Sequence, residues 1–146
     1  MVMFYNLSYD NLSRLPGASY LEGNTSSDKF STSYSYDKHG NMLNLPRHGN
    51  IGTSTYGIID DLVMSYDGNL LVSVEDKGTN PSLSMSMDFK DGSHESVEYA
   101  YDGNGNMVKD LNKRISMIEY NFLNLPRRIT FTGVNNPVNE YVYSSG

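Results

Sequence analysis

The sequence is organised by a short motif that recurs along most of its length. In the four best copies an apolar or aromatic residue lies two positions before a tyrosine, and aspartate follows that tyrosine: Leu7-Ser8-Tyr9-Asp10, Tyr34-Ser35-Tyr36-Asp37, Met64-Ser65-Tyr66-Asp67 and Tyr99-Ala100-Tyr101-Asp102. Two weaker copies are Ile118-Glu119-Tyr120-Asn121 and Tyr141-Val142-Tyr143-Ser144. A unit of this size cannot bury its own apolar face, so recurrence predicts that about six loose units stack against one another.

The second copy shows how one unit can fold as a hairpin. Phe30, Thr32, Tyr34 and Tyr36 alternate with other residues, so in an extended strand they share one face. The segment 37–41, Asp-Lys-His-Gly-Asn, has turn chemistry, because Asp can accept a hydrogen bond from the backbone two residues on and Gly and Asn tolerate positive φ. The segment 42–45 is expected to return as the second strand, and Pro46 is expected to end the pairing.

Equivalent turns follow the other copies, including Asp67-Gly68-Asn69 between two strand-like runs. The chain shows no run of helical period with caps. We therefore predict an all-β fold in which consecutive antiparallel hairpins form one curved sheet or partial barrel, as a single domain over residues 1–146. The residues predicted to form the structural core of the repeats are Tyr9, Asp10, Tyr34, Tyr36, Asp37, Gly40, Tyr66, Asp67, Gly68, Tyr99, Tyr101, Asp102, Gly105, Tyr120 and Tyr143.

Charge and composition narrow the function classes. The net charge of −6 argues against a nucleic-acid partner, because no chain-wide positive field exists to hold a phosphate backbone. The chain has no cysteine, which removes disulfides and thiolate metal sites. No apolar run is long enough to span a membrane. We expect no metal and no cofactor.

Several groups of acidic residues are candidates for metal-binding or catalytic sites. Asp102, Asn104 and Asn106 place oxygens at alternate positions as a calcium loop does, but Met107 and Lys113 stand where that loop needs Gly and a carboxylate. A repeat turn is therefore the better interpretation. His94, Glu95 and Glu98 do not have the spacing of a metal site, and His39 and His48 are expected at the surface. The pairs Asp60-Asp61 and Asp88/Asp91 are carboxylates of the kind that glycosidases use, but catalysis ranks third among the hypotheses.

The motif copies resemble the YD-repeat family, also called rearrangement-hotspot (RHS) repeat proteins. The resemblance rests on Tyr36-Asp37 through Met42, Tyr66-Asp67 through Leu70, Tyr101-Asp102 through Met107, and the Tyr120 to Pro126 stretch. It implies strands that spiral into a large β shell, which in bacterial members encloses a C-terminal toxin and in other members contributes to surface adhesion. The chain opens inside a repeat and lacks the terminal self-cleavage segment, so we expect a piece of a longer array.

Two functions follow as hypotheses. The first is a non-enzymatic structural segment of a bacterial surface or secreted protein, with an export signal outside this chain and with other YD repeats, in the same or a neighbouring chain, as partners. The second is a carbohydrate or cell-surface binding module, because tyrosine rings outside the core form platforms for sugar rings. The candidate platform residues are Tyr5, Tyr20, Tyr56 and Tyr141. Unpaired sheet edges also predict a homodimer.

Overall fold

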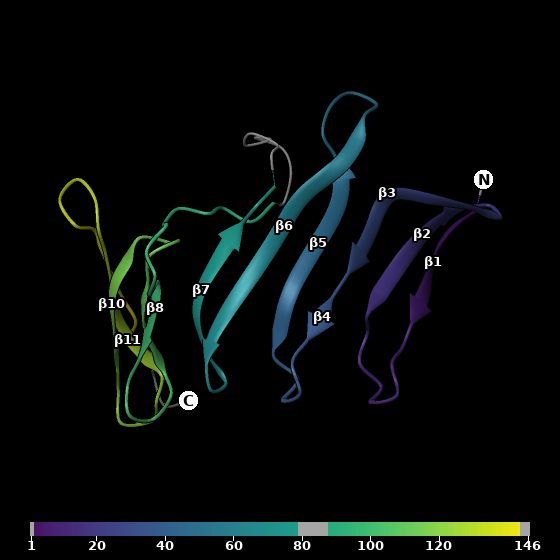
Figure 1. Cartoon of the computed structure of the whole chain (residues 1–146). Coiled ribbons are helices and arrows are strands. Elements are labelled where there is room, and N and C mark those ends of the chain that lie inside the picture. The colour runs from purple at the N-terminus through teal and green to yellow at the C-terminus, as the bar shows by residue number, and fades with distance from the viewer. Residues whose placement is uncertain (1, 79–87, 144–146) are drawn as a thin grey trace. The chain divides into compact units, whose positions relative to one another are not determined.

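The computed structural model describes residues 2–78 and 88–143. These residues form strands, turns and irregular loops, and none of them is helical, which confirms the all-β prediction (Figure 1). The strands are β1 (Met3–Ser8), β2 (Gly17–Glu22), β3 (Thr25–Ser33), β4 (Ser35–Tyr36), β5 (Met42–Asn50), β6 (Tyr56–Asp67), β7 (Leu70–Asp76), β8 (Tyr99–Tyr101), β9 (Met107–Asp110), β10 (Ile115–Tyr120), β11 (Pro126–Phe131) and β12 (Val138–Glu140).

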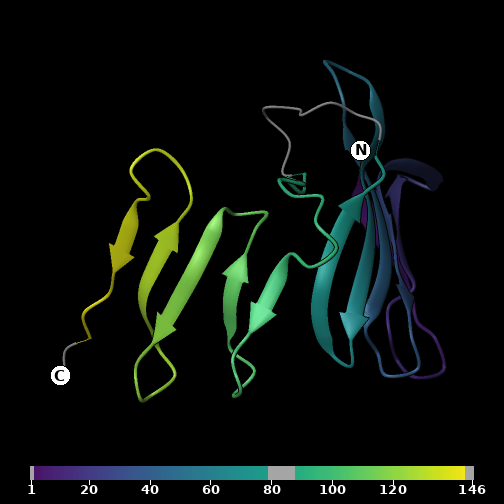
Figure 2. The same ribbon diagram turned by 60° about the vertical axis from the view of Figure 1, so that its left-hand side comes forward.

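Most strands pair with the strands that precede and follow them in the chain, as consecutive hairpins require; the exceptions are β3 and β4, which both pair with β5, and β7 and β8, which belong to different sheets. One sheet has the order β1-β2-β3-β5-β6-β7, with β4 paired to β5, and the second has the order β12-β11-β10-β9-β8. The strands pair antiparallel from β1 to β6 and from β8 to β12. Within the described residues neither order closes on itself, so both sheets are open. Figure 2 shows the hairpins of the second sheet from green β8 to yellow β12.

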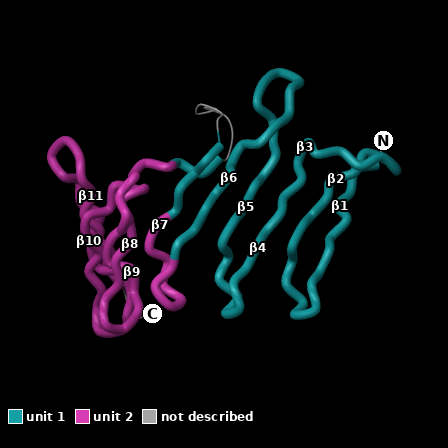
Figure 3. The backbone as a smooth tube through the Cα atoms, viewed as in Figure 1, with its two compact units in different colours: residues 1–65, 74–90 teal, residues 66–73, 91–146 magenta. Residues whose placement is uncertain are grey.

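The chain divides into two compact units, coloured separately in Figure 3. Unit 1 comprises residues 1–65 and 74–90, and unit 2 comprises residues 66–73 and 91–146. Unit 1 contains β1 to β5 and most of β6, whereas unit 2 contains β8 to β12 and the tip of the β6–β7 hairpin. That tip is a two-residue turn with Gly68 at φ 61°, the conformation that a tight hairpin requires at its first central position.

The pairing of β5 corrects one prediction. Pro46 does not end the strand, because β5 continues to Asn50 and Pro46 is in register with Asp61 of β6. On the other side of β5, Thr32 pairs with Arg47 and Ser35 pairs with Asn44, so Pro46 is opposite the interruption between β3 and β4. Because the neighbouring strand is interrupted opposite Pro46, the lack of an N–H in proline costs no inter-strand hydrogen bond there.

The apolar interior of each unit is small. The buried apolar residues are Ala18, Tyr20, Leu62 and Val74 in unit 1 and Tyr99 and Ile115 in unit 2. Gly49 and Gly57 are cross-strand partners in β5 and β6, and their missing side chains make room for two isoleucines. A Cβ at Gly49 would lie 2.8 Å from Cδ1 of Ile59, and one at Gly57 would lie 2.9 Å from Cδ1 of Ile51. With so little apolar burial, polar contacts between hairpins become important.

Candidate functional site: the joints between hairpins

Four turns share one hydrogen-bond pattern, those that begin at Asp10, Asp37, Asp102 and Asn121. In each, the side-chain Oδ1 accepts from the backbone N–H two residues and four residues further on, at 2.8–3.1 Å. The carbonyl of the first residue also accepts from the N–H three residues on, at 3.0–3.2 Å. One side chain therefore organises the whole turn, as the sequence predicted for aspartate at this place.

The fourth residue of each turn adopts a left-handed backbone conformation. Its φ is 59° at Ser13, 91° at Gly40, 82° at Gly105 and 57° at Asn124. Glycine and asparagine adopt this conformation at low cost, whereas serine does so less readily. The turn thus explains why glycine or asparagine stands three positions after Asp37, Asp102 and Asn121.

The second carboxylate oxygen of each aspartate binds the side chain at the end of its own turn. Oδ2 accepts from Arg14 Nε at 2.7 Å in the first turn, from Asn41 Nδ2 at 2.8 Å in the second and from Asn106 Nδ2 at 2.9 Å in the third. The fourth turn ends at Leu125, which has no side-chain donor, and it begins with the neutral Asn121. Turns that begin with the charged aspartate thus end with a residue whose side chain can donate a hydrogen bond, whereas the turn that begins with neutral asparagine does not.

These hydrogen bonds favour the charged carboxylates. The pKa of Asp10 is lowered mainly by the backbone N–H of Arg14, and that of Asp102 mainly by the side-chain amide of Asn106. At Asp37, partial burial raises the pKa, but the hydrogen bonds from Asn41 and His39 outweigh it, so the pKa is also lowered. The same oxygens that could have bound calcium at Asp102 are occupied by the turn itself.

Three tyrosine hydroxyls bind the backbone of the preceding hairpin. Tyr36 Oη donates to the carbonyl of Leu15 at 3.0 Å, Tyr120 Oη to that of Met107 at 2.6 Å, and Tyr143 Oη to that of Pro126 at 2.7 Å. Each acceptor is five residues after the residue that begins the preceding turn, from 10 to 15, from 102 to 107 and from 121 to 126. We call this contact the tyrosine joint.

A variant of the joint occurs at the hairpin with the shorter turn. The hydroxyl oxygen of Tyr101 accepts a hydrogen bond from the backbone N–H of Leu71, four residues after Asp67. Leu71 thus donates through its N–H where Leu15 and Met107 accept through their carbonyls, and it lies four rather than five residues after the residue that begins the turn. Burial raises the pKa of Tyr101 and of Tyr120, which keeps both hydroxyls neutral at physiological pH.

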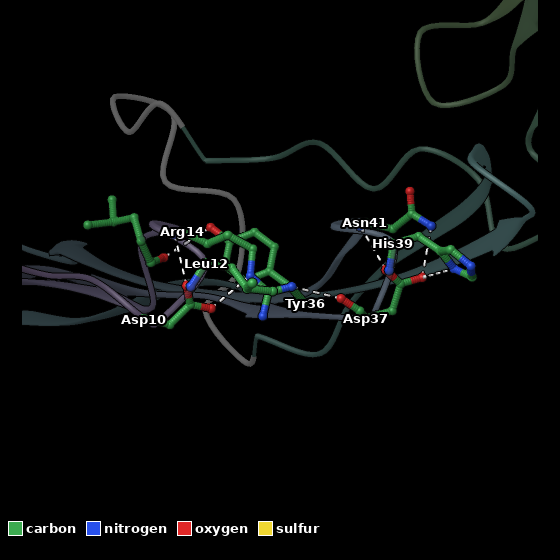
Figure 4. Close-up of polar contacts among 8 residues, drawn as sticks. Asp10, Leu12, Arg14, Tyr36, Asp37, His39 and Asn41 are labelled. Atoms are coloured by element: carbon green, nitrogen blue, oxygen red, sulfur yellow. Dashed lines mark hydrogen bonds and ion pairs between the residues drawn. The ribbon is translucent and has the colours of Figure 1, made fainter.

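Consecutive turns also contact each other directly. Arg14 Nη1 donates to the carbonyl of Asp37 at 2.8 Å, and its guanidinium lies over the ring of Tyr36, 5.0 Å from the centroid (Figure 4). In unit 2, Asn106 Nδ2 donates to Oδ1 of Asn124 at 3.2 Å. Arg14 therefore binds its own turn, the next turn and the tyrosine of the joint between them.

Ring contacts form in a different set of residues from the joint tyrosines. Tyr5 contacts Tyr20, Tyr20 contacts Phe30, and Phe30 contacts Tyr56, with ring centroids 5.1–5.5 Å apart in edge-on geometry. We call these four rings the aromatic row. Lys29 Nζ lies 5.2 Å from the Tyr56 centroid and forms an ion pair with Glu22 at 2.7 Å.

The predicted platform tyrosines differ in exposure. Tyr5 is 51% and Tyr141 44% exposed, Tyr56 is half-buried, and Tyr20 is only 6% exposed. Tyr5, Tyr20 and Tyr56 belong to the aromatic row, whereas Tyr141 borders a shallow cavity of about 490 Å³ in unit 2. Other side chains at that cavity are those of Asn121, Arg127, Arg128, Glu140 and Tyr143. Tyr141 is thus separate from the other three.

The remaining predicted repeat residues occupy varied positions. Tyr99 is buried and accepts a hydrogen bond from Asn112 Nδ2 at 3.1 Å, Tyr34 and Tyr66 are half-buried, and Asp67 and Gly68 are exposed in their turn. Tyr9 is 63% exposed, and its hydroxyl has no partner among the described residues. It belongs to the first hairpin, so no earlier hairpin in the described chain offers it a carbonyl.

The most deeply buried side chains are acidic. Asp60 is 1% exposed; its carboxylate forms an ion pair with Arg47 of β5 and accepts from the N–H of Phe89 at 2.6 Å. Glu98 is equally buried and accepts from Asn112 Nδ2 at 2.8 Å. Asp110 is buried next to Lys113, at 3.2 Å. These contacts stabilise the fold, since each acid is held by protein donors.

The other acidic candidates do not form one cluster. Asp88 belongs to unit 1 and pairs with Lys90, while Asp91 belongs to unit 2 and lies 3.6 Å from His94 Nδ1. Within residues 2–78 and 88–143, no group of three or more His, Asp and Glu side chains gathers as a metal site. That part of the chain also holds no helix with the length and apolarity to cross a membrane.

Sequence reasoning missed the residues that complete the joints. It placed Asn41 in a turn and considered Asn106 as an oxygen of a calcium loop, but it did not predict that each side-chain amide donates to the aspartate four positions before it. It also missed Arg14 and the Arg47–Asp60 pair. The shared spacing of aspartate and asparagine was a usable signal, whereas the Arg47–Asp60 contact depends on strand register.

No protein-family model and no curated protein sequence matches this chain. The resemblance to YD-repeat proteins therefore stays a prediction that rests on the motif copies themselves.

Proposed function

We propose that this chain is a structural, non-catalytic wall segment of a bacterial surface or secreted YD-repeat protein. The observation that supports the proposal is the tyrosine joint, which recurs with the same offset between successive hairpins. In the copies that form the joint, the motif side chains make internal contacts. The oxygens Oδ1 and Oδ2 of the aspartate bind within the turn, and the tyrosine hydroxyl binds the neighbouring hairpin. A motif used in this way contributes rigidity.

The wall function is tested by removing the joints and measuring rigidity. The variant Tyr36→Phe/Tyr120→Phe/Tyr143→Phe should lose protection from proteolysis and from backbone hydrogen exchange at the hairpin junctions. The matched control Tyr5→Phe/Tyr9→Phe/Tyr141→Phe removes three exposed hydroxyls and should keep protection close to that of the unaltered chain. Equal protection in both variants would count against the proposal.

The enzyme hypothesis has its own test. The purified chain is assayed for hydrolysis of glycans and peptides, together with Asp88→Asn and Asp91→Asn. Hydrolysis by the unaltered chain that either substitution abolishes would replace the structural function with a catalytic one.

The cavity beside Tyr141 favours a second candidate function, carbohydrate binding. A half-exposed tyrosine ring next to carboxylate and guanidinium groups provides a stacking face and partners for sugar hydroxyls. Glu140 and Arg128 line the same cavity, and Oε1 of Glu140 lies 3.8 Å from Nε of Arg128. The cavity volume of about 490 Å³ is in the range of small-ligand sites.

Glycan binding can be measured on an array of immobilised oligosaccharides and by saturation-transfer NMR. Tyr141→Ala should abolish any signal, while Tyr9→Ala, a similar loss of an exposed ring in unit 1, should not change it. If the chain binds no glycan, or binds glycans equally well without Tyr141, the carbohydrate-binding candidate is rejected and the wall function is the one that remains.

A further inference from the structure

The strand β1 presents an edge without the usual features that prevent association. It is the end strand of its sheet order, and all six of its residues are exposed. None of them is charged, and four are large and apolar: Met3, Phe4, Tyr5 and Leu7. Natural edge strands are commonly protected by charges, proline, bulges or short length. In comparison, the end strand β12 has three residues and carries Glu140.

The hydrogen-bond pattern shows which backbone groups of β1 face outward. The N–H of Gly23 donates to the carbonyl of Val2, so Val2 and Gly23 form a hydrogen-bonded pair at the end of the β1–β2 register. Hydrogen-bonded pairs alternate with non-hydrogen-bonded pairs along an antiparallel ladder. The backbone N–H and carbonyl groups of Phe4, Asn6 and Ser8 therefore also point toward β2. The N–H and carbonyl groups of the alternate residues Met3, Tyr5 and Leu7 therefore point away from the sheet.

These outward groups are self-complementary. A second β1 running antiparallel can pair Tyr5 with Tyr5, Met3 with Leu7 and Leu7 with Met3, which is the register that uses all three outward residues of both strands. The pairing brings no charged residue opposite another, and it places apolar side chains opposite apolar side chains. A two-fold axis at Tyr5 relates the two strands, as an isologous interface requires.

The aromatic row supports the same register. The row runs from Tyr56 through Phe30 and Tyr20 to Tyr5, the residue at the outer edge of the sheet. Partners in a hydrogen-bonded antiparallel pair have Cα atoms about 5.5 Å apart and side chains on one face. Tyr5 of a second copy would therefore continue the row at the spacing that it already has within one chain.

We propose that β1 is a homodimerisation edge, where two copies of this chain pair their Met3–Ser8 strands antiparallel about Tyr5. This interaction goes beyond the wall function and depends only on unit 1. The interface is one strand wide, so the dimer should form reversibly and depend on protein concentration.

The test is sedimentation velocity of the full chain over a wide concentration range. The unaltered chain should pass from monomer to dimer, and Tyr5→Lys should raise the dissociation constant roughly tenfold or more, because it places two ammonium groups at the axis. The control Phe122→Lys changes an equally prominent exposed aromatic in a turn of unit 2 and should leave dimerisation unchanged. Circular dichroism checks that each variant keeps its strand content.

Single-cysteine variants test the register, since the chain has no cysteine of its own. Tyr5→Cys should form a disulfide-linked dimer on oxidation, whereas Met3→Cys should not, because the two copies of residue 3 are four residues apart along the paired strands. Three results would overturn the proposal: a monomer at every concentration, a dimer insensitive to Tyr5→Lys, or faster cross-linking through Met3→Cys than through Tyr5→Cys.

Discussion

The hydroxyl of Tyr120 donates to the backbone carbonyl of Met107 at 2.6 Å, and this bond joins the β10–β11 hairpin to the β8–β9 hairpin. The acceptor is a backbone group, so the contact needs a particular residue on one side only. A repeat protein can then vary the residue at the acceptor position, which is Leu15, Met107 or Pro126 in the three direct joints, and still keep the joint.

Removing that hydroxyl should weaken unit 2. We expect Tyr120→Phe to lower the free energy of unfolding by about 1 kcal/mol, because it deletes one partly buried hydrogen bond and leaves a carbonyl without its partner. Equilibrium denaturation measures the change. Tyr141→Phe removes a hydroxyl that has no partner among the described residues of the same unit and should change stability by less than about 0.5 kcal/mol. Similar losses in both variants would contradict the joint.

Arg14 should be more important for unit 1 than its position near a turn suggests. Its guanidinium binds Asp10, the carbonyl of Asp37 and the ring of Tyr36, so Arg14→Ala should cost about 1–2 kcal/mol of unfolding free energy. Arg14→Lys should recover only part of the loss, because an ammonium group cannot donate in these directions and stack at once. Lys77→Ala is the control, since the ammonium group of Lys77 forms an exposed pair with Glu75, with Nζ 3.7 Å from Oε2. Full recovery by lysine would show that charge alone matters.

The turn aspartates should make stability depend on acid pH. Their folded-state pKa values are lowered, so the stabilisation is complete above the unfolded pKa of about 3.9 and is lost as pH falls through the folded pKa. The variant Asp10→Asn/Asp37→Asn/Asp102→Asn should show a smaller loss of unfolding free energy between roughly pH 5 and pH 2. Denaturant titrations at a series of pH values measure the slope.

The turn that begins at Asn121 gives the reciprocal experiment. Asn121→Asp should add an acid-dependent component, because the new carboxylate would accept from the N–H groups of Leu123 and Leu125. If neither the triple variant nor Asn121→Asp changed the slope, the turn carboxylates would not be linked to stability.

Sequence reasoning reached the hairpins because their determinants are local. Asp37 and Gly40 form one turn within five residues, so the alternation before them and the turn chemistry predicted both strands. It failed at Pro46, where the outcome depends on an interruption between β3 and β4 that no local pattern reveals. It also did not predict the aromatic row, because only the sheet order β1-β2-β3-β5-β6 brings those four rings together.

The buried ion pair between Arg47 and Asp60 shows the same dependence on register, and it yields the last prediction. Arg47 and Asp60 are direct cross-strand partners in β5 and β6, and Asp60 also accepts from the N–H of Phe89. Asp60→Ala should cost about 2–3 kcal/mol, since it leaves a partly buried guanidinium and a backbone donor without their acceptor. Glu75→Ala, in an exposed pair, should cost less than about 0.5 kcal/mol.

A double-mutant cycle separates the pair from the burial of the single charge. If the Arg47–Asp60 contact is what makes Asp60 costly to remove, Arg47→Met/Asp60→Ala should be less destabilised than the sum of the two single variants, because the guanidinium that loses its carboxylate partner is removed as well. Strict additivity would mean that Asp60 acts through Phe89 alone. In that case the acid would serve to hold the segment that begins at Asp88, and the register of β5 against β6 would depend on the ladder and on the Gly49–Gly57 contact with the two isoleucines.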